Sequence, residues 1–309
     1  MTESCSALDV VEGIDLSSKT CVITGASSGL GRESARALAA AGARVILAAR
    51  NADALGEANR WIHAEVPDAK TSTVQLDLTS LDSVRAAAVA IRNVTSVVHV
   101  LMNNAGVMFT PFGRTRDGFE MQIGTNYFGH FELTRLLVPQ LSAAEGARVV
   151  ILSSGGHVLG GVDLDDPNWD SREYDKFVAY GASKTANILH AIEADRRLRS
   201  LGIRAYAVHP GTVATSLARY MSRSDFSQLR RYAVASSAAR GESTDGYLDF
   251  TTPEHGAATQ VWAAVSPDLA DQGGLYLEDC SVSDAVAPHA RDTEYAAALW
   301  LLSEKLCAQ

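Results

Sequence analysis

Tyr180 and Lys184 could carry out acid–base chemistry, because they stand four residues apart in the segment YGASK. Residues four apart on a helix share one face, and the sequence predicts a helix over 177–200. A phenol with a pKa of about 10 is a poor acid–base group at neutral pH. A nearby ammonium stabilises the phenolate and lowers that pKa, so the pair could exchange a proton with an alcohol or carbonyl oxygen. Such pairs also arise by chance on helices, so other motifs must support this interpretation.

Two further places offer polar groups for the same site. Ser153 and Ser154 end a predicted strand, where a hydroxyl could hold a substrate oxygen or simply cap the strand. Asn126 lies in a long predicted helical region over 117–144, and a polar side chain buried there needs a partner.

The segment TGASSGLG over 24–31 joins a predicted strand to a predicted helix. Glycines let the backbone turn tightly and approach a pyrophosphate, and the helix N-terminus supplies free N–H groups. Glycines also serve ordinary turns. After the first strand of a β–α–β unit, however, the segment favours dinucleotide binding.

The residues after the second strand bear on which dinucleotide is bound. An NAD site usually has an acid about 20 residues beyond the turn, bonded to the ribose 2′-hydroxyl, whereas this strand ends in Arg50 and Asn51. Arg32 and Arg50 suit a 2′-phosphate, although both could be solvated. Asp53 could instead act as the NAD acid. The pattern therefore favours NADP(H) and leaves NAD(H) possible.

Two other strand ends face the same expected crevice. Asp77 and Leu78 follow the third strand, where Asp77 could contact adenine or cap a turn. The segment NNAG over 103–106 follows the fourth strand, and its small residues would let a ribose pass. Asn104 could also only stabilise the turn.

Apolar strands alternate with helical segments along the whole chain. The predicted helices cover 51–66, 80–92, 117–144, 177–200, a segment opened by Pro253, and 292–306. Ser80 is the predicted N-cap of the helix over 80–92. The predicted strands cover 20–24, 44–49, 71–76, 97–103, 147–153, 203–208 and 274–278. Continuous apolar strands separated by helices imply a parallel sheet covered on both faces. We therefore predict an α/β fold, a Rossmann-type doubly wound sheet of about seven strands.

Length and composition fit one soluble domain over residues 1–309, with loop insertions at about 156–175 and 216–250. The net charge of −9 argues against nucleic-acid binding and against a basic membrane-binding surface. The four scattered cysteines indicate reduced thiols in a cytoplasm, and the histidines form no metal motif. No apolar run is long enough for a membrane helix. A homodimer is possible.

The motifs TGASSGLG, NNAG, SSG, YGASK and HPG occur in this order, each at a strand end or on the adjoining helix. In this the chain resembles the short-chain dehydrogenase/reductase family over about residues 18–280. The stretches TNYFGHFELT, DDPNW, YGASKTANIL and HPGTVAT are similar to the retinol-dehydrogenase-like subgroup. Membrane-bound members of that subgroup carry an N-terminal apolar anchor, which this sequence does not show. Gly155 and Gly156 make the pocket floor small, and His157 could contact substrate or have no role.

The resemblance implies a catalytic tetrad. Tyr180 would be the general acid/base, Lys184 would lower its pKa and hold the nicotinamide ribose, Ser154 would polarise the substrate oxygen, and Asn126 would anchor a relay water. The implied cofactor residues form four groups along the chain. They are Gly25, Ser27, Ser28, Gly29, Leu30 and Gly31 at the turn; Arg32 and Arg50 at the 2′-phosphate; Asp77, Leu78, Asn104, Ala105 and Gly106 at adenine and ribose; and Pro210, Gly211, Val213 and Thr215 with Tyr180 and Lys184 at the nicotinamide.

The expected function is an NADP(H)-dependent oxidoreductase that interconverts a carbonyl and an alcohol on a small-to-medium, lipophilic substrate. Two alternatives remain: an NAD-dependent alcohol dehydrogenase of the same fold, and a dinucleotide-binding regulator without catalysis. A regulator could dispense with Tyr180 and Lys184, and both are present.

Overall fold

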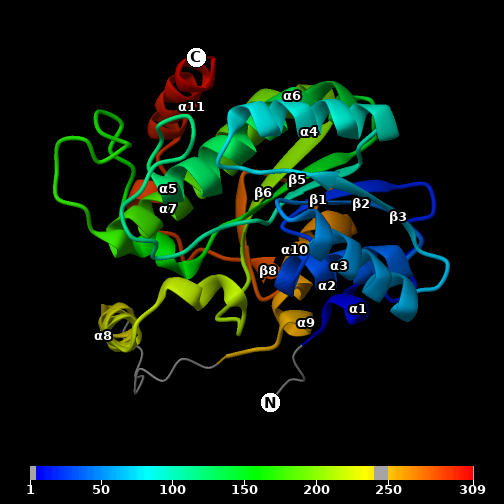
Figure 1. Ribbon diagram of the computed structural model, residues 1–309, viewed down its shortest axis with the longest axis horizontal. Coiled ribbons are helices and arrows are strands. Elements are labelled where there is room, and N and C mark those ends of the chain that lie inside the picture. The colour runs from blue at the N-terminus through cyan, green and yellow to red at the C-terminus, as the bar shows by residue number, and fades with distance from the viewer. Residues whose placement is uncertain (1–4, 240–249, 309) are drawn as a thin grey trace.

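The computed structural model describes residues 5–239 and 250–308, and in these ranges eight strands form one sheet (Figure 1). The strand order is β3-β2-β1-β4-β5-β6-β7-β8. The strands are β1 Thr20–Thr24, β2 Arg44–Ala49, β3 Lys70–Gln75, β4 Val100–Asn103, β5 Ala147–Leu152, β6 Ile203–His209, β7 Leu275–Glu278 and β8 Ser281–Val282. All neighbours pair in parallel except β7 and β8. The predicted seven strands are confirmed, and the two-residue antiparallel β8 was missed because so short a segment has no detectable period.

The strand order reverses beside β1. The chain passes from β1 outward to β2 and β3, and then returns to place β4 on the other side of β1. In doubly wound sheets the crevice at such a reversal, outside the carboxyl ends of the strands, is where ligands bind. The fold therefore brings the ends of β1, β2 and β4 to one place.

Helices cover both faces of the sheet, and successive strand residues enter two separate cores. Val22 and Ile46 pack toward α4, α6 and α7, whereas Ile23 and Leu47 pack toward α2, α3 and α10. This alternation explains why each buried strand is apolar throughout. The helices are α1 Ala7–Val10, α2 Gly29–Ala40, α3 Ala52–Glu65, α4 Leu81–Val94, α5 Met121–Ile123, α6 Gly129–Ser142, α7 Lys176–Leu198, α8 Arg223–Ala239, α9 Pro253–Gly256, α10 Ala258–Val265 and α11 Thr293–Cys307.

Two predicted helix starts are confirmed. The Ser80 hydroxyl accepts a hydrogen bond from the backbone N–H of Ser83 at the start of α4. Pro253 occupies the first position of α9, where its missing N–H has no intrahelical partner to lose.

The region 117–144 differs from the single long helix that was predicted. It contains α5, a π-helical turn over Gly124–Phe128, and then α6. The π turn bonds residue i to i+5, and apolar periodicity does not reveal one extra residue in a turn. It places Asn126 in the irregular turn itself.

The second predicted insertion is partly helical in the residues that the structure describes. It contains a 3₁₀ turn over Ser216–Tyr220 and helix α8, while residues 240–249 of the predicted insertion lie outside the described residues. In the described ranges no helix is long and apolar enough to cross a membrane. No group of three potential metal-binding side chains occurs in the same residues.

Candidate active site and cofactor cavity

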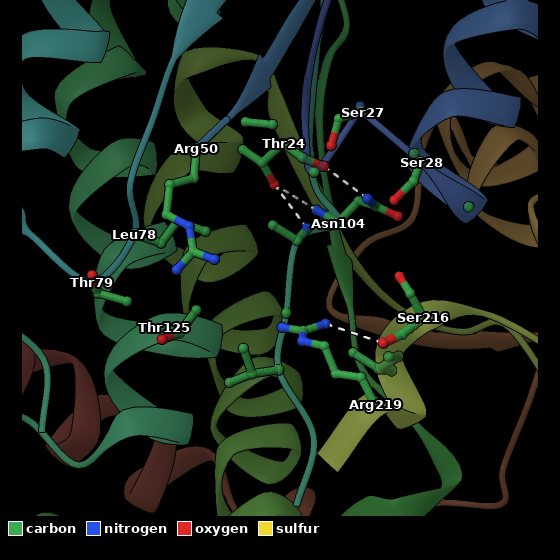
Figure 2. A pocket seen from close by; sticks show the side chains of 18 of the residues that line it. Thr24, Ser27, Ser28, Arg50, Leu78, Thr79, Asn104, Thr125, Ser216 and Arg219 are labelled. Carbon is green, nitrogen blue, oxygen red and sulfur yellow. Dashed lines mark hydrogen bonds between the residues drawn. The ribbon is translucent and has the colours of Figure 1, made fainter. Parts of the chain in front are cut away.

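A cavity of about 600 Å³ lies at the carboxyl ends of β1 to β4 (Figure 2). It brings together most of the residues that the sequence assigned to a cofactor. Those that line it are Gly25, Ser27, Ser28, Gly29, Leu30, Gly31, Arg50, Asp77, Leu78, Asn104, Ala105, Gly106 and Thr215.

The glycine-rich turn has no room for side chains at two positions. A Cβ on Gly31 would lie 2.5 Å from both the Asn104 amide nitrogen and the Gly25 carbonyl oxygen. Gly25 adopts a φ of +67°, which side-chain-bearing residues rarely adopt. Ser28, the N-cap of α2, forms no side-chain capping bond, so the amide groups of this helix start are left for a ligand. These features fit a dinucleotide pyrophosphate.

A buried hydrogen-bond network fixes this turn to the end of β4. The Asn104 side chain donates to the Thr24 carbonyl oxygen at 2.7 Å, while the Thr24 hydroxyl accepts from the Asn104 and Ala105 amides at 2.9 and 3.0 Å. Gln260 of α10 donates to Ser34 at 2.5 Å and to Asn104 at 3.3 Å. Asn104 therefore both lines the cavity and stabilises the turn. Sequence analysis missed Gln260, whose signal was a single amide in an otherwise apolar helix.

The two predicted phosphate-binding arginines are placed differently. Arg50 extends into the cavity. Arg32 is absent from the lining: its guanidinium carbon lies 4.2 Å from the Trp61 ring centroid and its Nη2 lies 3.9 Å from Glu33. Arg50 therefore lies in the cavity, whereas stacking on the Trp61 ring places Arg32 outside its lining. That both arginines bind one phosphate stays a prediction.

Arg219 is a cation of this cavity that sequence analysis missed. It lies on the 3₁₀ turn Ser216–Tyr220, lines the cavity and donates to the Ser216 carbonyl at 3.2 Å. Figure 2 shows Arg50 and Arg219 extending into the cavity from two sides. No local signal in the sequence marks Arg219, which stands six residues after Val213, since only the folded turn brings it back to the crevice.

Asp77 lines the cavity and also forms a turn. Its Oδ1 accepts from the Thr79 amide at 3.0 Å and from the Thr79 hydroxyl at 2.7 Å. Asp53 sits in the first turn of α3 and is not among the lining residues.

A second cavity, of about 700 Å³, adjoins the first and holds the predicted chemical groups. The two share lining residues at the end of β4 and after β6. The predicted site residues that line the second cavity are Ser154, Tyr180, Lys184, Pro210, Gly211, Val213 and Thr215.

Tyr180 and Lys184 are both buried at the start of α7, which Asp175 caps. Burial raises the pKa of Tyr180 to about 12, and a hydrogen bond with the Ser154 hydroxyl acts in the lowering direction. Burial lowers the pKa of Lys184 to about 7. Its Nζ donates to the Leu152 carbonyl at 3.0 Å and lies 5.7 Å from the Tyr180 ring centroid. The sequence-based expectation of a lowered tyrosine pKa is therefore not met here, because desolvation is the larger influence on both groups.

Asn126 is fully buried, and its side chain forms hydrogen bonds with Val107 and Ser183. Its Oδ1 accepts from the Val107 amide at 2.8 Å, and its Nδ2 donates to the Val107 carbonyl and to Ser183 Oγ, both at 2.9 Å. Ser183 Oγ donates in turn to the Tyr180 carbonyl at 2.8 Å. Asn126 thus ties the cofactor side of β4 to the helix that carries Tyr180.

His157 lines the second cavity, and its ring also holds two loops together. Its Nδ1 donates to the Ser154 carbonyl at 2.8 Å, and its Nε2 accepts from the Ala287 amide at 3.0 Å. Gly156 is required beside it, because a Cβ there would lie 2.8 Å from the Tyr180 ring.

Apolar groups form the far wall of the second cavity. The Phe109 ring contacts those of Phe177 and Tyr180 at centroid distances of 4.5 and 5.0 Å. Phe109 has a φ of +52° and is held by a 2.8 Å bond from its amide to Gln122. A polar edge faces this wall, where His209 Nε2 lies 3.6 Å from Glu278 Oε1.

Comparisons with known proteins agree with this geometry. Residues 19–225 match the family model for short chain dehydrogenases. Human retinol dehydrogenase 13 is 38% identical over 290 residues, which cover 93% of this chain and 84% of that protein. The crystal structure of an uncharacterised protein from Mycobacterium paratuberculosis is 35% identical, with a TM-score of 0.76 over 99% of this chain and 98% of that one.

A more distant structure shares the fold. L-sorbose reductase from Gluconobacter frateurii, complexed with NADPH and L-sorbose, is 23% identical, with a TM-score of 0.63 over 86% of this chain and 95% of that one. The family match and the retinol dehydrogenase relative together establish an oxidoreductase that acts on CH–OH groups. The chain belongs to the short-chain dehydrogenase family and is retinol-dehydrogenase-like within it.

Proposed function

We propose that this protein is an NADP(H)-dependent oxidoreductase that interconverts a carbonyl and an alcohol, with Tyr180 as general acid/base. The observation that carries the proposal is the junction of the two cavities. There Ser154, Tyr180 and Lys184 stand beside the cavity formed by the glycine-rich turn. A bound nicotinamide would supply or accept the hydride. The residues of this chain hold the substrate oxygen and move its proton.

The proton assignment follows from the hydroxyl groups at the junction. The Ser154 and Tyr180 hydroxyls line the same cavity, and the Ser154 hydroxyl acts to lower the pKa of Tyr180, so one substrate oxygen can meet both groups. Tyr180 donates its proton to the oxygen of a carbonyl that is being reduced, or accepts the proton of an alcohol that is being oxidised. Lys184 lies close enough to favour the phenolate when its ammonium is charged.

The preference for NADP(H) is supported by charge in the first cavity. Arg50 follows the end of β2, where NAD-binding proteins of this type usually carry an acid. Arg219 adds a second guanidinium to the same cavity. L-sorbose reductase, which shares the fold, was crystallised with NADPH. NAD(H) is the alternative cofactor, and a binding comparison separates the two.

The proposed substrate is a small-to-medium lipophilic carbonyl or alcohol. Phe109, Met221 and Leu229 belong to or pack against one apolar cluster that includes Tyr180, and all line the second cavity.

We also propose a cytoplasmic location, from the scattered cysteines, and allow for a homodimer.

The cofactor proposal is tested by titrating tryptophan fluorescence with NADPH and NADH. In the wild type we expect NADPH to bind more tightly. Arg50→Ala should weaken NADPH binding by about tenfold or more and leave NADH nearly unchanged, because one charge-assisted phosphate contact is lost. Arg44→Ala is the matched control, since Arg44 is exposed at the opposite end of the same strand. Equal affinities for the two cofactors, or an Arg50→Ala variant that behaves like Arg44→Ala, would contradict the NADP(H) preference.

A further inference from the structure

His130 of α6 is fully buried between the cofactor turn and the π-helical turn. Its Nδ1 lies 2.9 Å from the carbonyl oxygen of Asn126, and its Nε2 lies 2.8 Å from the hydroxyl oxygen of Thr24. One imidazole ring therefore spans from β1 to the residue that ties β4 to α7.

The hydrogen-bond partners of the two ring nitrogens decide which nitrogen carries the proton. A carbonyl oxygen can only accept, so Nδ1 must carry the hydrogen that goes to Asn126. The Thr24 hydroxyl already accepts from the Asn104 and Ala105 amides, which occupies its two lone pairs. Its own hydrogen is then free for Nε2, which lies closer to the hydroxyl oxygen, at 2.8 Å, than the alternative acceptor, the Met102 carbonyl, at 3.4 Å.

We propose that His130 is a positioning residue of this enzyme, which as the neutral Nδ1–H tautomer holds the cofactor turn through Thr24 and the catalytic network through Asn126. The mechanical consequence follows from the bonds already described. Thr24 fixes Asn104 and Ala105 under the cofactor cavity, while Asn126 fixes Val107 and, through Ser183, the backbone of Tyr180. A shift at one end is transmitted to the other through a single rigid ring.

The surroundings of the ring favour its neutral form. An imidazolium would point an N–H at a Thr24 oxygen that has no lone pair left to accept it. Burial lowers the pKa of His130 to about 4, and the nearby Lys184 charge acts in the same direction. The ring therefore stays neutral throughout the range in which a carbonyl reductase would work.

His190 of α7 offers a matched comparison inside the same protein. It is as buried as His130 and contacts the rings of Tyr127, Phe131 and Trp300. Within residues 5–239 and 250–308, neither of its ring nitrogens has a hydrogen-bond partner. Replacing His190 therefore tests the effect of losing a buried ring without losing a bridge.

The tautomer can be measured directly on the full-length protein labelled with ¹⁵N-histidine. A long-range ¹H–¹⁵N correlation spectrum, assigned with His130→Asn, should show His130 with a protonated Nδ1 and an unprotonated Nε2. That pattern should not change between pH 8 and pH 6. An Nε2–H tautomer, or a ring that titrates in this range, would overturn the proposal. The result stands whether or not the proposed cofactor binds.

The functional consequence rests on the proposed function and is measured on variants. His130→Leu should weaken NADPH binding and lower kcat, each by about tenfold, the scale of one buried hydrogen bond. His130→Asn can retain only the bond to Asn126, so kcat should recover more than cofactor affinity. His190→Leu should change neither, although both leucine variants should alter thermal stability.

The outcomes separate the two proposals. If His130→Leu binds NADPH and turns over like His190→Leu, the positioning role is overturned. If the wild type itself neither binds NADPH nor reduces a carbonyl, the proposed function fails, and the spectrum alone decides the bridge.

Discussion

Lys184 shows how burial at a single residue shapes both chemistry and stability. Its ammonium is almost completely removed from water, and its Nζ donates to the Leu152 carbonyl. This burial brings the pKa of Lys184 to about 7 from an ordinary value of 10.5. A group with such a pKa changes charge near neutral pH, which suits a residue that assists proton transfer.

The lowered lysine pKa has a consequence for stability against pH. Between pH 7 and pH 10.5 the unfolded chain keeps the Lys184 proton and the folded chain releases it, so the free energy of unfolding rises with pH. Relative to Lys184→Met, the wild type should therefore gain stability between pH 7 and pH 9, by up to about 1.4 kcal/mol per pH unit. Tyr180, whose folded pKa is about 12, has the opposite effect but only above about pH 10.

Urea unfolding at pH 6, 7.5 and 9 checks this expectation. Lys305→Met is the control, because Lys305 is exposed on α11 and its removal should give a difference that does not vary with pH. A difference between wild type and Lys184→Met that is constant from pH 6 to pH 9 would show that burial does not change the lysine pKa.

At the scale of elements, the junction of the glycine-rich turn with helix α2 tolerates little change in residue size. Gly31→Ala would place a methyl group 2.5 Å from Asn104 and from the Gly25 carbonyl. Because these atoms belong to a buried network, we expect a loss of roughly 2 kcal/mol or more in stability and at least a tenfold loss in NADPH affinity. Gly56→Ala in α3 meets only the end of the Arg60 side chain, at 3.7 Å. It should stabilise the protein by about 0.5–1 kcal/mol.

Thermal unfolding and NADPH titration of the two variants test this pair. If Gly31→Ala bound NADPH as the wild type does, the close approach of the turn to the end of β4 would not be needed for the cofactor.

The sequence predicted the elements well where a segment was apolar along its whole length. The strands over 20–24 and 44–49 match β1 and β2 in both ends, since buried parallel strands are apolar throughout. The π turn at Asn126 could not be predicted, because one extra residue in a helical turn leaves the apolar pattern nearly intact. The contact of Arg32 with Trp61 could not be predicted for a different reason: Trp61 lies on α3, and no local pattern links the two residues.

Across the whole molecule, the first cavity gathers two basic side chains in a chain that is acidic overall. The chain carries a net charge of −9, yet two guanidinium groups, from Arg50 and Arg219, line one cavity. Arg50 directly follows β2 and Arg219 lies on the 3₁₀ turn Ser216–Tyr220, so the fold brings together two residues that are 169 positions apart in the chain. A doubly wound topology could be predicted from the order of elements, whereas the return of the 3₁₀ turn Ser216–Tyr220 to this cavity required the folded structure.

The same topology joins the first cavity, at the glycine-rich turn, to the second cavity, which contains Ser154 and Tyr180. This junction is the basis of the central claim: hydride transfer occurs at one end of the cofactor while Tyr180 transfers the proton. Loss of the Tyr180 hydroxyl should therefore remove chemistry without removing cofactor binding.

The most direct measurement follows deuterium from 4,4-dideuterated NADPH, which carries the label on both faces of the ring, into the product of a panel of lipophilic aldehydes and ketones, by mass spectrometry. We predict that the wild type forms an alcohol carrying one deuterium on carbon. Tyr180→Phe should still bind NADPH but form the product about 10²–10⁴-fold more slowly, and Tyr295→Phe on α11 should behave as the wild type. Deuterated alcohol formed equally fast by Tyr180→Phe, or none formed by a wild type that binds NADPH, would contradict the account.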